Sequence, residues 1–469
     1  MHFYIIKYNK ESGGYMYYDL IVLGGGPAGY LAAERAGKAG MKTLLIEERA
    51  IGGVCLNEGC IPTKTMLHSA KIYDYARLSE KYGVTTEHVS IDHTQVLKRK
   101  QKVVKLLTSG INSQLKASNV DLVMGRGYIV KRDNEGVHIA AGDHTYICKH
   151  LLIATGSSPI IPPIPGVEDG LKSGLVMTSR EILDLATIPQ SLVVIGGGVI
   201  GLEMASYFNS VGSQVTVIEM LDHIGGQTDK EIAEILLKNY QKKGITFHLE
   251  AKVTEITSDG LYYTKGNQHE FIPAERILLS VGRRPNTQNL GLENIGVQLD
   301  GAAIKVDEYG ATTVPRVYAA GDVNGRSMLA HTAYREAEVC VNHMLGKADQ
   351  MRYHAIPAVI YTNPEVASVG ETEVTATAKG IDFTTAKISM RYSGRYVAEN
   401  EGGDGICKVL IDNHSQKLIG VHLISNYASE IIYGAAAFIE SEMKVEDIRR
   451  IVFPHPTVSE IIREAMFSL

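Results

Sequence analysis

Cys55 and Cys60 are the two residues best placed to do chemistry together. They lie five positions apart in the segment CLNEGCIPTK, in a chain that has five cysteines among 469 residues. This spacing is too wide for one face of an unbroken helix, and it favours a strained turn that leads into a helix and brings the two sulfur atoms together. A helix N-terminus there would make either thiol a better nucleophile. We expect no metal, because no second Cys/His pair lies at ligand spacing; two unrelated buried thiols remain the alternative.

A second candidate pair lies near the end of the chain, where FPHPTVSEII places His455 five residues before Glu460. A carboxylate beside an imidazole fixes its tautomer and raises its basicity, so the pair could act as a general base. The chain has 16 histidines, so a core or solvated role is the alternative for His455.

Two glycine-rich segments, Leu20–Glu48 and Leu192–Met220, repeat one pattern of apolar strand, glycine turn, helix and second strand. The glycines of a G-x-G-x-x-G turn allow a tight bend, close approach of a pyrophosphate and close helix packing, and the acid that follows binds ribose hydroxyls. One copy alone also fits a turn without a ligand, but two complete copies predict two Rossmann-like dinucleotide-binding domains. The matched positions are Gly24, Gly26, Gly29 and Glu47 in the first copy and Gly196, Gly198, Gly201 and Glu219 in the second. Glu219 favours NAD over NADP, because no arginine follows it to receive a 2′-phosphate.

The rest of the chain supplies the elements that must position these groups. Further strand-then-glycine segments, LLIATGSSP from Leu151 and ILLSVGRRPN from Ile277, alternate with helical patterns, which is typical of α/β domains. The tail differs: CKVLIDN from Cys407 and LIGVHLIS from Leu418 predict antiparallel strands, and helical patterns follow over 428–442 and 458–466. We therefore expect a separate α+β domain from about residue 353.

The bulk composition excludes several classes of protein. A net charge of −5 without a basic run gives no reason to expect nucleic acid. No apolar stretch reaches the roughly 20 residues that span a bilayer, so we expect no membrane association. The N-terminus shows no signal-peptide pattern, and the scarce cysteines fit a reducing cytoplasm, where we expect the protein to be.

Together these motifs resemble the disulfide-reductase family of flavoproteins. The resemblance covers the chain from Met16 onward and rests on CLNEGCIPTK, GGGVIGLE, LLIATGSSP, AAGD and HPTVSE, in the family's order. It implies an α/β fold with Rossmann-like domains for FAD and NAD and a C-terminal α+β dimerisation domain. The implied boundaries are an N-terminal extension over 1–15, an FAD-binding domain with a redox disulfide over 16–160, an NAD-binding domain over 161–283, a central domain that completes the FAD site over 284–352, and a dimerisation domain over 353–469.

The resemblance also implies roles for single residues. Cys55 would exchange with the substrate, Cys60 would contact the flavin, and His455 with Glu460 would be the acid/base supplied by the partner subunit. The implied FAD site is Gly24, Gly26, Gly29, Glu47, Lys64, Gly127, Thr155, Gly156, Ser157, Asp322, Met328, Leu329, Ala330 and His331. The implied NAD site is Gly196, Gly198, Gly201, Glu203, Glu219, Val253 and Gly282. Lys64 is either a surface lysine or a cation near the flavin, paired with Glu203.

The activity implied by the resemblance is oxidation of protein-bound dihydrolipoyl groups to lipoyl groups, with reduction of NAD. The implied partners are a second copy of the chain and a lipoyl-bearing acyltransferase or glycine-cleavage lipoyl protein. The alternative is an NAD(P)H-dependent reductase of another disulfide, such as a glutathione-like or coenzyme A disulfide, or of mercury. Two features depart from the family's pattern: Phe453-Pro454 before the histidine, and Glu58, which would add a negative charge near the thiols.

Overall fold

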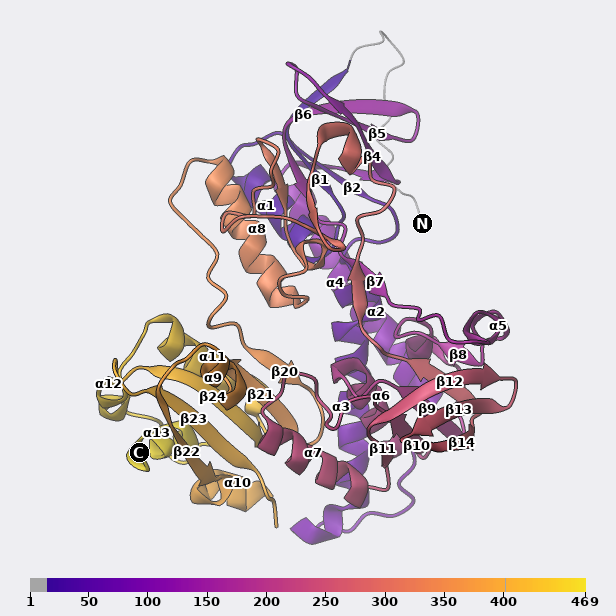
Figure 1. The fold of residues 1–469 in the computed structure, drawn as a ribbon, viewed down its shortest axis with the longest axis vertical. Coiled ribbons are helices and arrows are strands. Elements are labelled where there is room, and N and C mark those ends of the chain that lie inside the picture. Colours follow the sequence, from indigo (N-terminus) through magenta and orange to yellow (C-terminus); the bar gives the residue numbers. More distant parts are fainter. Residues whose placement is uncertain (1–14, 401) are drawn as a thin grey trace. The chain divides into compact units, whose positions relative to one another are not determined.

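The computed structural model describes residues 15–400 and 402–469 (Figure 1). The predicted extension over 1–15 therefore lies, apart from Tyr15, outside the described residues. The chain forms two compact units. Unit 1 comprises the described residues up to Pro62 together with Lys100–Ile160 and Arg283–Arg352, and unit 2 comprises Thr63–Arg99, Ile161–Gly282 and Tyr353–Leu469.

Unit 1 is built on a sheet with the strand order β3-β2-β1-β6-β5-β4, with β19 paired to β6. Residues of β1 alternate between two cores: Ile21 packs on one face of the sheet, whereas Leu20 and Val22 pack on the other. Both faces are covered, which is why β1 ends in four consecutive buried apolar residues, Leu20–Leu23. The strands are β1 (Met16–Leu23), β2 (Thr43–Glu47), β3 (Val120–Met124), β4 (Gly127–Arg132), β5 (Val137–Ala141), β6 (His144–Ile153) and β19 (Val317–Ala319). Helices α1 (Pro27–Lys38) and α8 (Ala330–Met344) share the second core and lie side by side (Figure 1).

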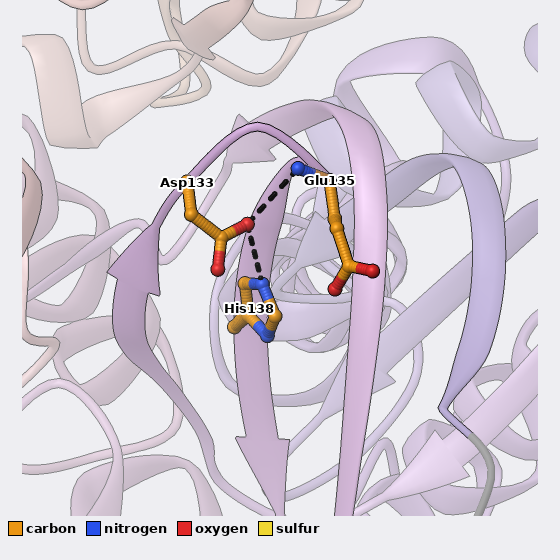
Figure 2. A group of neighbouring side chains, drawn as sticks. All are labelled: Asp133, Glu135 and His138. Carbon is orange, nitrogen blue, oxygen red and sulfur yellow. Dashed lines mark hydrogen bonds and ion pairs between the residues drawn. The ribbon is translucent and has the colours of Figure 1, made fainter.

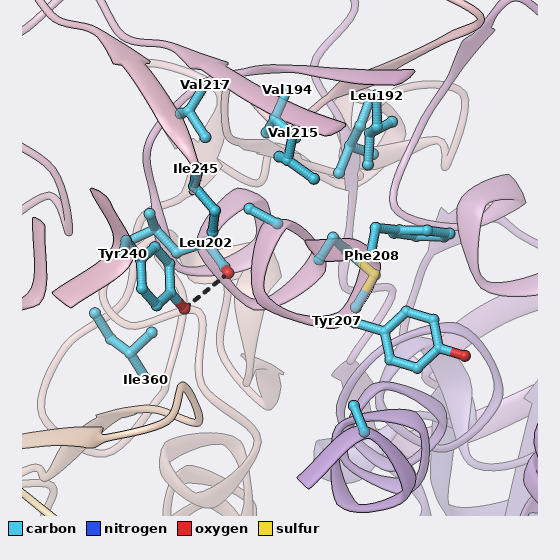
Figure 3. Packing of buried hydrophobic residues seen from close by; sticks show 14 of the residues in the cluster. Leu192, Val194, Leu202, Tyr207, Phe208, Val215, Val217, Tyr240, Ile245 and Ile360 are labelled. Carbon is cyan, nitrogen blue, oxygen red and sulfur yellow. Dashed lines mark hydrogen bonds between the residues drawn. The ribbon is translucent and has the colours of Figure 1, made fainter. Parts of the chain in front are cut away.

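Unit 2 contains a parallel sheet with the order β11-β10-β9-β15-β8. Its strands are β8 (Val176–Met177), β9 (Ser191–Ile195), β10 (Gln214–Ile218), β11 (Thr246–His248) and β15 (Arg276–Leu279). Side chains of β9 and β10, such as Val194 and Val215, point toward Leu202 and Phe208 of α6 (Val199–Ser210), as Figure 3 shows. A three-stranded antiparallel sheet follows, made of β12 (Ala251–Thr257), β13 (Gly260–Lys265) and β14 (Gln268–Pro273).

The C-terminal part of unit 2 is an antiparallel sheet with the order β20-β21-β24-β23-β22. Its strands are β20 (Ala358–Ile360), β21 (Glu365–Gly370), β22 (Phe383–Ser389), β23 (Ile406–Asp412) and β24 (Leu418–Ser425). Helices α11 (Ala428–Glu440) and α13 (Glu460–Phe467) pack into the core of this sheet. The predicted fold class, two dinucleotide-binding folds and a C-terminal α+β domain, is thus confirmed. Over the described ranges, no helix is long and apolar enough to cross a membrane.

Candidate functional site

The two glycine-rich turns have almost the same backbone geometry. Gly24 and Gly196, the first glycine of each, have φ angles of +101° and +103°, which side-chain-bearing residues rarely adopt. A Cβ atom on the third glycine would lie 1.7 Å from the Gly24 carbonyl oxygen if placed on Gly29, and 2.2 Å from that of Gly196 if placed on Gly201. Each helix can therefore pack on its strand only because these positions are glycine.

The acid of each repeat holds its own turn. Glu47 Oε2 accepts a hydrogen bond of 2.6 Å from the Gly25 N–H, and Glu219 Oε2 accepts one of 2.6 Å from the Gly197 N–H. Both carboxylates therefore lie at the turn, on the side where a ribose would follow a bound pyrophosphate.

Helices α1 and α6 begin in a form that fits a phosphate ligand. Their N-cap residues are Gly26 and Gly198, which supply no side-chain hydrogen bond to the first turn. The amides of each first turn are thus available to an anion, and the helix dipole favours negative charge there. The two repeats fit the dinucleotides that the sequence predicts.

The redox segment is divided between two consecutive helices. Cys55 lies in α2 (Gly53–Glu58), and Cys60 is the first residue of α3 (Cys60–Arg77), with Gly59 between the helices. Both thiols are half-buried. A Cβ atom on Gly59 would lie 2.9 Å from the Val54 carbonyl oxygen, so the junction between the helices is tight. The N-terminal position of Cys60 places its sulfur at the positive end of a helix dipole, which stabilises a thiolate.

The start of α2 rests directly on the first glycine-rich turn. The Gly52 N–H donates to the Gly25 carbonyl over 2.8 Å. Gly53 has a φ of +56°, and a Cβ atom on it would lie 2.5 Å from the Gly26 Cα. The cysteine segment and the first glycine-rich turn are therefore packed backbone to backbone.

Glu58, expected to add a negative charge near the thiols, is paired with a cation. Arg49 donates to both of its carboxylate oxygens, over 2.9 Å each. The hydrogen bonds to Glu58 raise the pKa of Arg49, so the guanidinium stays charged. Sequence reasoning missed Arg49 because nothing in the spacing of the two residues indicates that they meet.

The predicted pair between Lys64 and Glu203 forms within unit 2. Lys64 Nζ lies 2.9 and 2.8 Å from the two carboxylate oxygens, and the Glu203 side chain is only 4% exposed. Tyr361, which sequence reasoning missed, completes the group: its N–H donates to Glu203 Oε1 over 3.0 Å, and its ring lies 4.4 Å from Lys64 Nζ. The lysine is thus held by a buried acid rather than lying free on the surface.

His455 and Glu460 also meet as predicted. His455 Nδ1 lies 2.9 Å from Glu460 Oε1, and the Thr457 N–H donates to the other carboxylate oxygen over 2.8 Å. Burial alone would raise the pKa of Glu460, but the hydrogen bonds from Thr457 and His455 outweigh it and lower the pKa. The bond occupies Nδ1, so Nε2 is the nitrogen left to face a substrate. The imidazole is 78% exposed in the single chain.

Several other predicted residues of the FAD site lie around a small antiparallel pair, β7 (Ser157–Pro159) and β16 (Arg283–Pro285). The Ser157 hydroxyl donates to Asp322 over 2.5 Å and accepts from Arg283 Nε over 2.8 Å. Thr155 donates to the Asn286 carbonyl over 2.7 Å. Arg283 and Asn286 were not predicted, although they belong to the segment ILLSVGRRPN.

The remaining predicted residues occupy strand ends and helix starts. Gly127 begins β4, and Met328–His331 surround the start of α8, whose N-cap is Leu329. In unit 2, Val253 lies in β12, and Gly282 has a φ of +111° after β15. Their roles toward a cofactor stay predictions.

Asp133, Glu135 and His138 form one further cluster of possible metal ligands, at the turn between β4 and β5 (Figure 2). Asp133 already accepts from the Glu135 N–H over 3.0 Å, contacts His138 Nε2 at 2.9 Å and pairs with Lys131 at 2.7 Å. Its charge is therefore balanced by neighbours, and the contacts are those of a hydrogen-bonded hairpin turn.

Comparisons with known proteins agree with this geometry. Residues 18–337 match the family model described as pyridine nucleotide-disulphide oxidoreductase, and residues 356–466 match the dimerisation domain of that family. A dihydrolipoyl dehydrogenase of Mycoplasma pneumoniae is 38% identical over 96% of this chain and 98% of its own length. A mitochondrial dihydrolipoyl dehydrogenase of Pisum sativum is 39% identical over 95% of this chain and 90% of its own length. The crystal structure of LpdA from Mycobacterium tuberculosis superimposes with a TM-score of 0.88 at 27% identity, covering 96% of this chain and 99% of that one.

Proposed function

Because the chain belongs to the pyridine nucleotide-disulphide oxidoreductase family, we propose that it oxidises protein-bound dihydrolipoyl groups to lipoyl groups and reduces NAD. The observation that carries the proposal is the segment CLNEGCIPTK, which places Cys55 in α2 and Cys60 at the start of α3, against the first glycine-rich turn. Relatives named dihydrolipoyl dehydrogenase match nearly the whole chain and support this choice of substrate.

The cofactors of the chain are FAD and NAD. The turn Gly24–Gly29 with Glu47 would hold FAD, and the turn Gly196–Gly201 with Glu219 would hold NAD, since both turns leave helix amides open to a pyrophosphate. When bound, FAD would supply the two-electron chemistry that links the reduced cysteines to NAD.

The chain's own residues carry the thiol chemistry. His455 accepts a proton at Nε2 from one thiol of the substrate, while Glu460 holds Nδ1. The resulting substrate thiolate attacks Cys55 of a Cys55–Cys60 disulfide, which forms a mixed disulfide and releases Cys60 as a thiolate. The second substrate thiol then displaces Cys55, so the substrate leaves as a cyclic disulfide and the enzyme holds two more electrons.

The dimerisation domain supports a homodimer, and the partner subunit would supply His455 and Glu460 to this reaction. The high exposure of His455 in a single chain fits such a role. We further propose a lipoyl-bearing acyltransferase or glycine-cleavage lipoyl protein as the partner, and the cytoplasm as the compartment. The competing function is reduction of another disulfide or of mercury by NAD(P)H, and Glu219 disfavours its NADPH-dependent form.

The proposal is tested by replacing Cys55 with serine. Cys55→Ser should retain FAD but lose NADH formation from dihydrolipoamide, because no disulfide remains to accept the substrate's electrons. Cys148→Ala removes a buried thiol of β6 and should keep full turnover. Dithiol turnover by Cys55→Ser at the wild-type rate would refute the mechanism. Faster turnover of wild type with glutathione disulfide, coenzyme A disulfide or mercuric ion than with lipoamide would favour the competing function.

A further inference from the structure

Tyr263, His248 and Glu270 form a hydrogen-bonded chain in unit 2, outside the second glycine-rich motif. Tyr263 Oη lies 3.1 Å from His248 Nδ1 and 2.5 Å from Glu270 Oε2. The Tyr263 side chain is 1% exposed, and its ring centroid lies 4.9 Å from that of His248. The three residues come from β13, β11 and β14 (Figure 1).

The donors and acceptors of these three side chains fix the direction of both hydrogen bonds. A carboxylate can only accept, so the single proton of the Tyr263 hydroxyl goes to Glu270. The phenol oxygen then accepts, which requires the proton of His248 on Nδ1. Burial and the bond to Glu270 raise the pKa of Tyr263 to about 12, so the hydroxyl keeps its proton.

His248 connects this chain to Glu219 through the backbone. The Glu219 N–H donates to the His248 carbonyl over 2.9 Å, and the Glu219 carbonyl accepts from the Ala251 N–H over 2.9 Å. The Glu250 N–H donates to the Leu221 carbonyl over 2.9 Å, and Glu250 holds a φ of +55°. The segment 248–251 is therefore hydrogen-bonded through its backbone to Glu219 and Leu221, directly after β10.

Tyr263 is also fixed to the other predicted NAD residue of this region. In the antiparallel pair of β12 and β13 it lies directly opposite Val253. One buried phenol thus links the backbone around Glu219, through His248, with the strand that carries Val253.

We propose that the chain His248–Tyr263–Glu270 is a positioning device that holds the Glu219 carboxylate at the ribose of NAD and thereby sets the preference for NAD over NADP. This inference rests on the proposed function, because it needs NAD to bind at Glu219. A fixed carboxylate accepts hydrogen bonds from the ribose hydroxyls and repels a 2′-phosphate, whereas a carboxylate that can move does both less well.

The test measures the Kd of NAD and of NADP by calorimetry on FAD-loaded protein. Tyr263→Phe leaves His248 and Glu270 without their shared partner and should weaken NAD binding about tenfold, the lower end of the loss seen when groups that orient metal ligands are removed. The Kd of NADP should change less, so the ratio of the Kd of NADP to the Kd of NAD should fall. His248→Leu should act like Tyr263→Phe. His248→Asn, whose Nδ2 lies close to the position of Nδ1 and can still donate to the phenol oxygen, should recover most of the affinity.

Tyr207→Phe is the matched control. Tyr207 is fully buried in unit 2, and its hydroxyl also lies 2.8 Å from a histidine nitrogen, Nδ1 of His93. This variant should lose thermal stability but keep the wild-type Kd for NAD and the wild-type NADP-to-NAD ratio.

The outcomes separate this inference from the proposed function. If wild type binds NAD and Glu219→Gln weakens it, but Tyr263→Phe and His248→Leu both bind NAD and NADP like wild type, the positioning role is wrong and the proposed function stands. If wild type does not bind NAD, both fail. Should Tyr263→Phe not fold, the same NAD affinity in His248→Leu and His248→Asn would overturn the positioning role, and a higher affinity in His248→Asn would support it.

Discussion

Lys408 is the buried cation whose removal should destabilise unit 2 most clearly. It lies in β23, with a side chain only 6% exposed, and its ammonium lies 3.0 Å from Asp229 and 2.6 Å from Glu373. Burial alone would lower the pKa of Lys408, but the hydrogen bonds to these two acids outweigh it and raise the pKa. The ammonium therefore stays charged and joins the C-terminal sheet to the start of α7 (Lys230–Lys242), which Asp229 caps.

The size of the effect follows from the two acids. Asp229 is 3% exposed, so Lys408→Met leaves a buried carboxylate without its cation, which costs about 3–5 kcal/mol. Glu373 is 45% exposed, so losing that pair adds no more than about 1 kcal/mol. The amides of Glu231 and Ile232 still bond Asp229 and offset about 1 kcal/mol. We expect a net loss of about 3 kcal/mol.

A double-mutant cycle measured by urea unfolding of the FAD-loaded protein checks this estimate. Asp229→Asn keeps a good helix cap without the charge, so Lys408→Met combined with Asp229→Asn should recover at least half of the loss. Lys387→Met removes an exposed lysine that pairs with the half-exposed Glu231, and it should cost less than about 1 kcal/mol. The reasoning is refuted if the free energy of unfolding of Lys408→Met lies within about 0.5 kcal/mol of that of wild type, a difference typical of surface substitutions. It is also refuted if the double variant is less stable than Lys408→Met alone.

Three further predictions concern the acid/base pair, a buried histidine and the first repeat. His455→Gln should lower kcat for dihydrolipoamide oxidation by at least about 100-fold, because it removes the general base, and an unchanged kcat would exclude that role. His150, which is 8% exposed with no partner for Nδ1 among the described residues, has its pKa lowered from 6.5 to about 4, chiefly by burial and then by Lys149 and Arg316. Its neutral form thus contributes stability that is complete above pH 6.5 and is lost as the pH falls toward 4, on the order of 3 kcal/mol at about 1.4 kcal/mol per pKa unit. His150→Gln should therefore lose less stability than wild type between pH 6.5 and pH 4, measured as the urea midpoint of unfolding. Gly29→Ala should abolish FAD retention on desalting, because its Cβ would lie 1.7 Å from a carbonyl oxygen, whereas Gly110→Ala, with open space around it, should retain the flavin.

The sequence predicted those parts of the site that depend on residues close together in the chain. The glycine turns and their acids could be located because each requirement, a positive φ at Gly24 or a missing Cβ at Gly29, is met within one strand–turn–helix unit. The pair His455–Glu460 was predicted from the spacing of the two residues within one short segment. The pair Lys64–Glu203 joins residues 139 positions apart, and it was predicted because opposite charges lie in the cysteine segment and on the second glycine-rich helix.

Contacts that depend on strand register or loop conformation could not be predicted. Tyr361 reaches Glu203 through a backbone N–H, a group that every residue except proline carries, from 158 positions away. In the segment LYYTK the buried tyrosine is Tyr263 rather than Tyr262, and a shift of one residue would exchange them. The pairing of Arg49 with Glu58 depends on the path of the loop before α2, which follows no periodic pattern.

Because α2 packs directly on the first glycine-rich turn, we expect these two segments to unfold locally as one cooperative unit. The Gly52 amide is bonded to the Gly25 carbonyl, and a Cβ atom on Gly53 would lie 2.5 Å from the Gly26 Cα, so the two backbones are in direct contact. Amide exchange in the turn and in the cysteine segment should therefore share one opening free energy. A ligand that orders the turn should then also lower the rate at which the half-buried Cys55 and Cys60 become fully exposed to oxidants in solution.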